Sequence, residues 1–374
     1  MSSAVAAIDT LTPRQLAWRR FKRHRLAMIA AATLAFLYGT ALFCEFIAPY
    51  GTEYRNVKAV NAPPMRIRWV DAQGEFNLRP FVYGYQMTVD DDTWMRIYRE
   101  DPNQKFDLYF FAEDADHPYE LWGLIPSTRH LITTSEGGYL HLFGTDGLGR
   151  DLFSRVFYGA RISLSIGVIG VLLTLLLGLM LGGVAGYFGG WTDSSVQRVI
   201  EVLQSMPTLP LWMALSAALP PAWSPLTAYF GVTIILSLFG WTALARQVRG
   251  RFLSLREEDF VIAARLTGAS NSRVIFKHML PSFFSHTITT ATLAVPAMIL
   301  GETALSFLGI GLRPPVVSWG VLLQQAQNFQ VIVMTPWLLI PGAFVVLTVI
   351  AFNLLGDGLR DAADPYNTSP NGGA

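Results

Sequence analysis

Charged residues are scarce in this sequence, and cysteine is almost absent. Asp, Glu, Lys and Arg make up 15% of the 374 residues, whereas a soluble domain carries about 25%. The single cysteine, Cys44, excludes an intramolecular disulfide and therefore a disulfide-stabilised secreted scaffold. The 28 Lys and Arg residues nearly cancel the 27 Asp and Glu residues, which excludes the basic excess typical of a nucleic-acid-binding protein.

Signatures of catalysis are missing as well. The sequence has no Gly-Lys dipeptide, hence no Walker A loop, and no His-Glu-x-x-His metal motif. Its 6 histidines are scattered, and Cys44 lies in an apolar run where a packing role is expected. We therefore expect no catalytic residue, no metal site, no cofactor bound by this chain and no nucleic-acid partner.

Long uncharged runs are what the sequence has instead. A helix needs roughly 20 apolar residues to cross a bilayer, and the runs predict six transmembrane helices in an all-α polytopic membrane protein. We expect the first helix over residues 26–48 and the other five within residues 162–356. Residues 202–245 are too long for one helix, and the prolines at 220, 221 and 225 divide them into two.

Basic residues predict the orientation of these helices. Six Lys and Arg residues lie between Arg14 and Arg25, and seven lie between Arg246 and Lys277. Short loops rich in Lys and Arg stay in the cytoplasm. We therefore expect an N-terminal tail (1–25), a loop (246–281) and a C-terminal tail (357–374) that are all cytoplasmic, in a multi-pass membrane protein.

Residues 49–161, called the insert below, are then expected outside the cytoplasm. Alternating segments at 65–70 and 76–79 flank a turn and predict a β-hairpin, and 108–111 and 139–143 look like further strands. We expect a small β-rich domain ending in an interfacial helix. Between Tyr50 and Arg161 there are 16 acidic and 12 basic residues, counted along the sequence. The insert is expected either to receive a soluble partner or to brace a neighbouring subunit.

Residues 259–281 carry the most informative pattern. Two adjacent alanines at 263 and 264 are followed by Gly268, and Leu-Pro comes at 280–281. Gly268 suits the position just after a helix, and Pro281 suits the first turn of the next one. The pattern predicts a helix–turn–helix whose small side chains allow a partner surface to approach the backbone. The alternative is an ordinary basic loop between two spans.

This pattern resembles the EAA loop of ATP-binding-cassette importer permeases, with Ile262 and His278 standing where that family has Glu and Ile. In the family, the loop forms a coupling helix that docks into a cleft on the ATPase subunit. The resemblance implies that residues 246–281, called the coupling loop below, contact an ATPase. The implied contact residues are Asp259, Ala263, Ala264, Arg265, Gly268, Ala269, Ser270, Leu280 and Pro281.

Residues 142–164, 305–320 and 351–365 are also similar to dipeptide and oligopeptide permeases of the C type, in an extended-loop subgroup. The resemblance implies a type I importer permease fold with six transmembrane helices and a β-rich extracytoplasmic insert. It also implies a heterodimer with a second homologous permease, two ABC ATPase subunits and an extracytoplasmic solute-binding protein, all at a lipid membrane. ATP and Mg would bind those ATPases.

Polar residues within the apolar runs are candidates for the translocation path. Proline and threonine side chains at such places either line a wet path or repair helix hydrogen bonds, and Glu302 is either functional or a satisfied carboxylate. Glycines at 178, 182, 186 and 190 form a ladder that favours close helix packing, within this chain or with a partner. The candidate path residues are Gln204, Ser205, Pro207, Thr289, Thr292 and Glu302.

The expected function is that of a permease subunit of an ATP-driven importer of di- and oligopeptides. Permeases of the same architecture also import oligosaccharides, opines or nickel complexes, and these cargoes stay open. An ion-coupled secondary transporter is disfavoured because paired intramembrane acids are missing. A membrane-embedded hydrolase is disfavoured because no nucleophile–base set is present.

Overall fold

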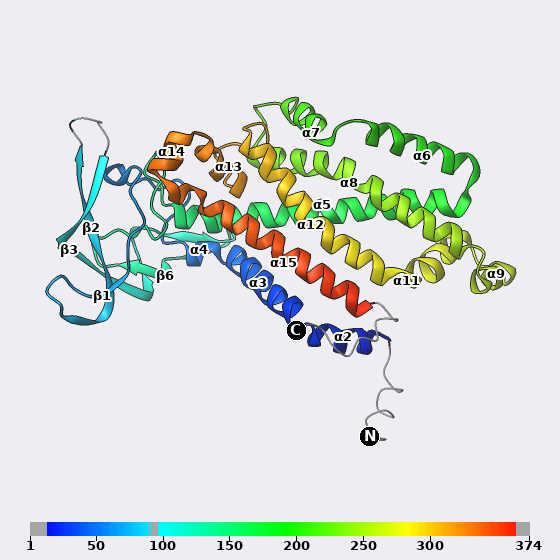
Figure 1. The fold of residues 1–374 in the computed structure, drawn as a ribbon, viewed down its shortest axis with the longest axis horizontal. Helices are drawn as coiled ribbons and strands as arrows, with labels where there is room; N and C mark the ends of the chain where they lie inside the picture. Colours follow the sequence, from blue (N-terminus) through cyan, green and yellow to red (C-terminus); the bar gives the residue numbers. More distant parts are fainter. Residues whose placement is uncertain (1–12, 90, 92–95, 364–374) are drawn as a thin grey trace, which may run out of the picture. The chain divides into compact units, whose positions relative to one another are not determined.

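The computed structural model of the chain describes residues 13–89, 91 and 96–363. Figure 1 follows these residues from α2 (Pro13–Arg23) to the last helix, and the predicted class, helical with a small β insert, is confirmed. The described residues form two compact units. The first draws on 13–35, Ser165–Glu302 and 346–363, and the second on the described residues of Phe36–Leu164 and on Thr303–Val345.

Five helices among the described residues are long and apolar enough to cross a membrane, judged by length and composition. The prediction was six. The helices are α3 (Arg25–Leu42), α5 (Leu152–Phe188), α8 (Pro225–Leu255), α12 (Phe284–Phe307) and α15 (Ile340–Ala363), the last preceded by the short η4 (Pro336–Leu339).

The expected third span is divided between two shorter helices, α6 (Gly190–Ser205) and α7 (Thr208–Ala217). Met206 and Pro207 between them are extended, with ψ values of 140° and 122°. Residues before a proline avoid the helical region, so Pro207 separates the helices. Pro296, by contrast, does not interrupt its helix, because α12 continues through it.

Two helices extend beyond the limits that the sequence predicted for their spans. The helix expected at the end of the insert is the first part of α5, which runs for 37 residues without interruption. Likewise α15 continues to Ala363, beyond the expected end of the last span at 356. At the start of α5, Leu152 packs in a buried cluster with Val317, Leu322 and Leu338.

The glycine ladder packs α5 against α8 within the first unit, and Figure 1 shows these two helices side by side. A Cβ on Gly182 would lie 2.5 Å from the carbonyl oxygen of Ala245, and one on Gly186 would lie 2.7 Å from that of Arg249. Only glycine allows backbones to approach so closely. The ladder therefore serves intramolecular packing at Gly178, Gly182 and Gly186, while Gly190 has open space around it.

The insert contains one antiparallel four-stranded sheet in the order β1-β2-β3-β6 and a separate β4-β5 hairpin. The predicted first hairpin is confirmed, since Val70 pairs with Phe76, and the predicted strand at 108–111 lies in β3. The strands are β1 (Arg68–Val70), β2 (Phe76–Val89), β3 (Arg96–Glu113), β4 (Tyr119–Leu121), β5 (Ile125–Ser127) and β6 (Arg129–Thr134).

The strand predicted at 139–143 was wrong, because these residues are irregular. Their apolar side chains are buried for another reason. Leu140 belongs to the sheet core with Met65, Val82, Leu108 and Ile132, and its amide donates to the hydroxyl of Tyr50 at 2.8 Å. Alternation alone does not distinguish a strand from a loop that crosses a core.

Buried ionic groups hold the loop before α5. Asp146 accepts from Nε of Arg150 at 2.8 Å, from Arg155 at 2.5 Å and from Gln325 at 3.3 Å. Burial by itself would raise the pKa of Asp146, but the two guanidinium groups and backbone donors more than offset it and lower that pKa. His141 and Asp151 form a second buried pair 3.0 Å apart.

Short helices complete both units. Residues 319–334 form α13 (Trp319–Gln324), η3 (Gln325–Gln327) and α14 (Phe329–Met334). Ser318 caps α13 by accepting from the amide of Val321 at 3.2 Å. The remaining short helices are α4 (Cys44–Ile47), η1 (Val57–Ala59), α9 (Asp259–Leu266), α10 (Asn271–Arg273), η2 (Val274–Met279) and α11 (Leu280–Ser282).

Candidate coupling site

The coupling loop begins on the end of α8 and turns into α9. Asp259 stands in the first turn of α9, where a carboxylate complements the helix dipole. At the other end, the amide of Ala269 donates to the carbonyl of Ala264 at 3.1 Å, and that of Gly268 donates to the carbonyl of Arg265 at 3.0 Å. This pair of bonds is a Schellman motif. Gly268 occupies its left-handed position with φ of +81°, as predicted.

A second helical segment follows at once. The hydroxyl of Ser270 accepts from the amide of Arg273 at 3.4 Å and caps α10. The chain continues through the π-helical η2 to α11, where Pro281 stands in the first turn. The predicted helix–turn–helix is therefore present. Its second helix starts nearer to the turn than the position of Pro281 indicated.

The loop is fastened to α5 and α8 by a buried core. Val261 of α9 and Val274 and Met279 of η2 pack with residues of both longer helices. Tyr187, near the end of α5, adds two polar contacts. The guanidinium of Arg265 lies 4.8 Å from its ring centre, and its hydroxyl donates to the side-chain oxygen of Asn271 at 2.7 Å.

A second connection joins α6 to α8. Both carboxylate oxygens of Asp193 accept from Arg249, one of them from Nη2 at 2.6 Å. Hydrogen bonding to Arg249 lowers the pKa of Asp193. A two-pronged guanidinium–carboxylate contact fixes orientation as well as distance, so α6 is held at a set angle to α8.

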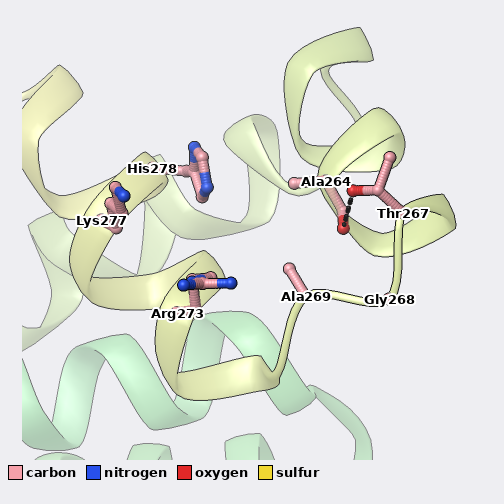
Figure 2. A pocket seen from close by; sticks show the side chains of 7 residues that line it. All are labelled: Ala264, Thr267, Gly268, Ala269, Arg273, Lys277 and His278. Atoms are coloured by element: carbon pink, nitrogen blue, oxygen red, sulfur yellow. Dashed lines mark hydrogen bonds between the residues drawn. The ribbon is translucent and has the colours of Figure 1, made fainter.

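A pocket of about 300 Å³ opens at the bend of the loop. Figure 2 shows the side chains of α9 and its turn on one side and three basic side chains of α10 and η2 on the other. A Cβ on Gly268 would meet nothing within 4 Å, so this surface is open to a partner. The residues lining the pocket, called the coupling pocket below, are Ala264, Thr267, Gly268, Ala269, Arg273, Lys277 and His278.

The structure thus brings together three of the nine predicted contact residues, Ala264, Gly268 and Ala269, at one pocket. The other six are accounted for in other ways. Arg265 lies against Tyr187, Ser270 is a cap, and Asp259 and Ala263 are exposed on α9. Leu280 packs against the loop's core, and Pro281 lies in α11.

Sequence reasoning missed the basic side of the coupling pocket. Thr267 lies in the predicted segment, but its hydroxyl is turned back onto the carbonyls of Ala263 and Ala264. Arg273 and Lys277 lie four residues apart, a spacing that places them on one helical face. That spacing was the available signal.

Comparisons with known proteins agree on one family. Residues 175–367 match the family described as "Binding-protein-dependent transport system inner membrane component", and residues 12–64 match "N-terminal TM domain of oligopeptide transport permease C". The first match covers more than half of the chain. This chain belongs to that family of inner-membrane transport components.

Curated relatives match the permease over 60% to 95% of its length. The dipeptide transport system permease protein DppC of Bacillus subtilis is 34% identical over 358 residues, which cover 95% of this chain and 87% of that protein. The oligopeptide permease OppC of the same species is 40% identical, over 60% of this chain and 72% of that protein. OppC of Haemophilus influenzae is 39% identical, over 68% and 76%.

A solved structure of the MetNI methionine ABC transporter, in an inward-facing conformation, is 17% identical with a TM-score of 0.40. It covers 55% of this chain and 95% of that one. The relatives establish the permease as a membrane component of an ABC transporter with ATPase partners, and not as an enzyme. The resemblance to C-type dipeptide and oligopeptide permeases is confirmed.

The predicted translocation residues of the permease do not form one site. Gln204 donates to the hydroxyl of Thr242 at 3.0 Å and lines a pocket of about 190 Å³ with residues of α7, α8 and α12. Ser205 and Pro207 are exposed next to it. Thr292 donates to the carbonyl of Ile288 at 2.9 Å, a back-bond within its own helix.

Thr289 and Glu302 are both buried in α12. Neither residue lines the pocket that holds Gln204, whose α12 members are Ala297 and Met298. Other residues found at that pocket include Thr208 and Trp212 of α7. The uncharged run at 202–245 predicted a helix here, but not that Thr208 and Trp212 would meet Gln204 at one pocket.

Proposed function

We propose that the permease is one half of an ATP-driven importer of peptides. It would pair with a second, homologous permease, and two ABC ATPases would bind ATP and Mg. A solute-binding protein would deliver the cargo. The names of the relatives support this proposal, because the three described above are dipeptide or oligopeptide permeases.

The coupling pocket carries the mechanical part of the proposal. Its small residues, Ala264, Gly268 and Ala269, leave the backbone accessible, and its opposite side is basic. A helix end of the ATPase with exposed carboxylates would fit such a pocket. Closure of the two ATPases on ATP would then move the loop.

The core around Tyr187 supports transmission of that movement to the membrane helices. Because Val261 and Val274 pack with α5 and α8, the loop cannot shift without displacing both helices. Packed elements move as rigid bodies, so the two permeases would alternate between outward and inward openings. No ion gradient enters this cycle.

We further propose that both termini and the coupling loop face the cytoplasm and that the insert faces outward. Cysteine labelling tests this orientation with an impermeant thiol reagent, because the native Cys44 is buried. The exposed positions Asp91 and Ser270 are replaced by cysteine one at a time. Asp91→Cys should react in intact cells and Ser270→Cys only in lysed ones. Reaction of Ser270→Cys in intact cells would overturn the orientation.

The insert is proposed to receive the solute-binding protein. Its acidic excess would attract a basic surface on that protein, an effect that is screened beyond about 8 Å at physiological salt. The alternative, bracing of the second permease, is separated from docking by shortening the β2–β3 ribbon. Thr88 pairs with Ile97, so residues 88–97 can be replaced by an Asn-Gly turn. Docking predicts that basal ATP hydrolysis persists while stimulation by the loaded binding protein disappears.

Uptake by the reconstituted transporter tests the cargo and the energy source together. Proteoliposomes that hold both permeases and the ATPases are given the binding protein and a labelled peptide, an oligosaccharide, an opine or a nickel complex. The proposal expects peptide uptake that needs ATP and survives collapse of the proton gradient. Uptake of another cargo alone would refute the peptide assignment, and uptake driven by the gradient without ATP would refute the ATP-driven mechanism.

A further inference from the structure

The β4–β5 hairpin has an apolar tip that the transport mechanism does not use. Residues 121–125 read Leu-Trp-Gly-Leu-Ile, a run without charge. The exposed fractions are 45% for Trp122, 78% for Leu124 and 54% for Ile125. Large apolar side chains gathered at one exposed point mark a contact surface. These five residues are called the hairpin tip below.

The turn of the hairpin is built to present an aromatic ring. Trp122 and Gly123 both have positive φ, 55° and 69°, the conformation for which hairpins normally use Asn-Gly or Asp-Gly. A bulky residue with positive φ is uncommon and strained. A tryptophan at this place is therefore not explained by the needs of the turn, and its indole supplies the reason.

That indole is attached to the end of the first membrane helix. Its Nε1 donates to the carbonyl of Leu42, the last residue of α3, at 2.7 Å. The backbone amide of Trp122 donates to a carboxylate oxygen of Glu45 at 3.3 Å, and its ring lies 5.9 Å from that of Phe43. The hairpin tip is thus fixed at the point where α3 stops.

A salt bridge between Arg161 and Glu45 also fixes the end of α3. Arg161 donates to both carboxylate oxygens of Glu45 at 2.6 Å and to the carbonyl of Leu42 at 2.9 Å. The sheet is joined there too, because Nδ1 of His130 lies 2.8 Å from the carbonyl oxygen of Ala48. The tip therefore has a defined height relative to α3.

That height coincides with a membrane boundary. The 18 residues of α3 rise about 1.5 Å each, a total of about 27 Å, and the hydrocarbon layer is about 30 Å thick. Arg25 at the first residue of α3 marks the opposite boundary. Leu42 then lies where hydrocarbon meets headgroups, the zone in which tryptophan is enriched because it combines an apolar ring with one donor.

We infer that the hairpin tip is inserted in the bilayer interface beside α3, and that lipid is the partner that covers Trp122, Leu124 and Ile125. The insert is thereby anchored to the membrane by a β-hairpin as well as by α3 and α5. This inference goes beyond the proposed transport function and holds for either orientation of the chain. A second protein subunit is the competing occupant, and the test distinguishes the two.

Spin labelling of the full chain, reconstituted in vesicles of phosphatidylcholine and phosphatidylglycerol with its copurifying subunits, tests the inference. A nitroxide is attached to Leu124→Cys, and Leu78→Cys serves as the matched control because Leu78 is 91% exposed in β2 of the same insert. The unmodified chain gives the background, since Cys44 is buried. Collision rates are measured with oxygen, which partitions into lipid, and with a water-soluble nickel chelate.

The expected result is a ratio of oxygen to nickel collisions that is several-fold higher at position 124 than at position 78. Ile125→Cys should agree with position 124 and stands in if the first variant does not fold. A label at 124 that is as accessible to nickel as the control would show a tip in water and overturn the inference. A label shielded from both reagents would show a protein occupant and also overturn it.

Discussion

The coupling loop and the insert differ in what their charged side chains contact. In the insert, the buried carboxylate of Asp146 accepts hydrogen bonds from Arg150, Arg155 and Gln325. In the coupling loop, the bend at Gly268 faces an open pocket with a basic side. The insert is built to hold its own shape, whereas the loop keeps one surface available. We infer that substitutions in the insert act mainly on stability and those in the coupling pocket mainly on coupling.

The largest effect is expected at Asp146. Asp146→Ala leaves the buried guanidinium groups of Arg150 and Arg155 without their shared carboxylate, a loss typically worth about 3–5 kcal/mol. The thermal unfolding midpoint of the detergent-purified chain should fall sharply, whereas the exposed Asp91→Ala should leave it unchanged. Equal midpoints for the two variants would show that the buried ionic cluster does not stabilise the insert.

Packing of α5 on α8 is the next most sensitive feature. Gly182→Ala places a methyl group 2.5 Å from a backbone oxygen of α8, while Gly183→Ala meets only Phe252 at 3.5 Å. Overpacking costs about 1–3 kcal/mol, so the first variant should unfold more readily than the second when the chain is purified alone. If Gly182→Ala instead weakens only assembly with another permease, the ladder is a subunit interface.

A smaller effect is expected from charge reversal in the coupling pocket. Arg273→Glu with Lys277→Glu should weaken association with the ATPases, and the difference from wild type should shrink as salt is raised, because exposed charges are screened. The unfolding midpoint should not change. Arg251→Glu lies in the coupling loop outside the pocket and is the control. An equal effect of that control would point to net charge and not to the pocket.

The smallest effect concerns pH at the junction of α4 and the hairpin tip. Burial would raise the pKa of Glu45, but hydrogen bonds from Arg161 more than offset it, and the pKa is lowered. A lowered pKa stabilises the folded state above the ordinary Glu value of about 4.3, and this contribution is lost as pH falls through the lower folded value.

Unfolding of wild type and Glu45→Gln, measured across that range, checks this prediction. Wild type should be the more stable protein near pH 7, and the difference should shrink as pH falls below the ordinary Glu value, as carboxyl protonation removes the ion pair. A difference that persists at low pH would mean that the Glu45 carboxylate is not what the substitution removed.

The sequence predicted those structural features that depend on a local property of the chain. Uncharged runs predicted the long membrane helices, and Gly268 predicted the end of α9, because few residues other than glycine adopt a φ of +81°. The sequence did not predict features that depend on contacts between residues far apart in the chain. The loop at 139–143 resembles a strand but is buried by the sheet core, and the extension of α5 to Leu152 depends on packing.

The candidate sites show the same division. Ala264 and Gly268 were predicted from a local pattern, whereas the approach of Arg273 and Lys277 to them depends on how η2 folds back. Likewise Gln204 was predicted, but the pocket that it shares with Trp212 requires α7 and α12 to meet. Spacing along the chain contains no information on such meetings, because they depend on tertiary packing.

Stimulated ATP hydrolysis in variants of Gly268 tests the role of the coupling pocket most directly. Gly268→Ala introduces backbone strain of roughly 1–2 kcal/mol without bulk, and Gly268→Trp adds bulk in the pocket. Gly190→Trp is the matched control for Gly268→Trp. Gly190 also has a positive φ, 56°, and a Cβ placed on it would also meet nothing within 4 Å. We predict that only Gly268→Trp abolishes stimulation by the loaded binding protein while the permease remains in the membrane. Normal stimulation in Gly268→Trp, or its equal loss in Gly190→Trp, would contradict the account.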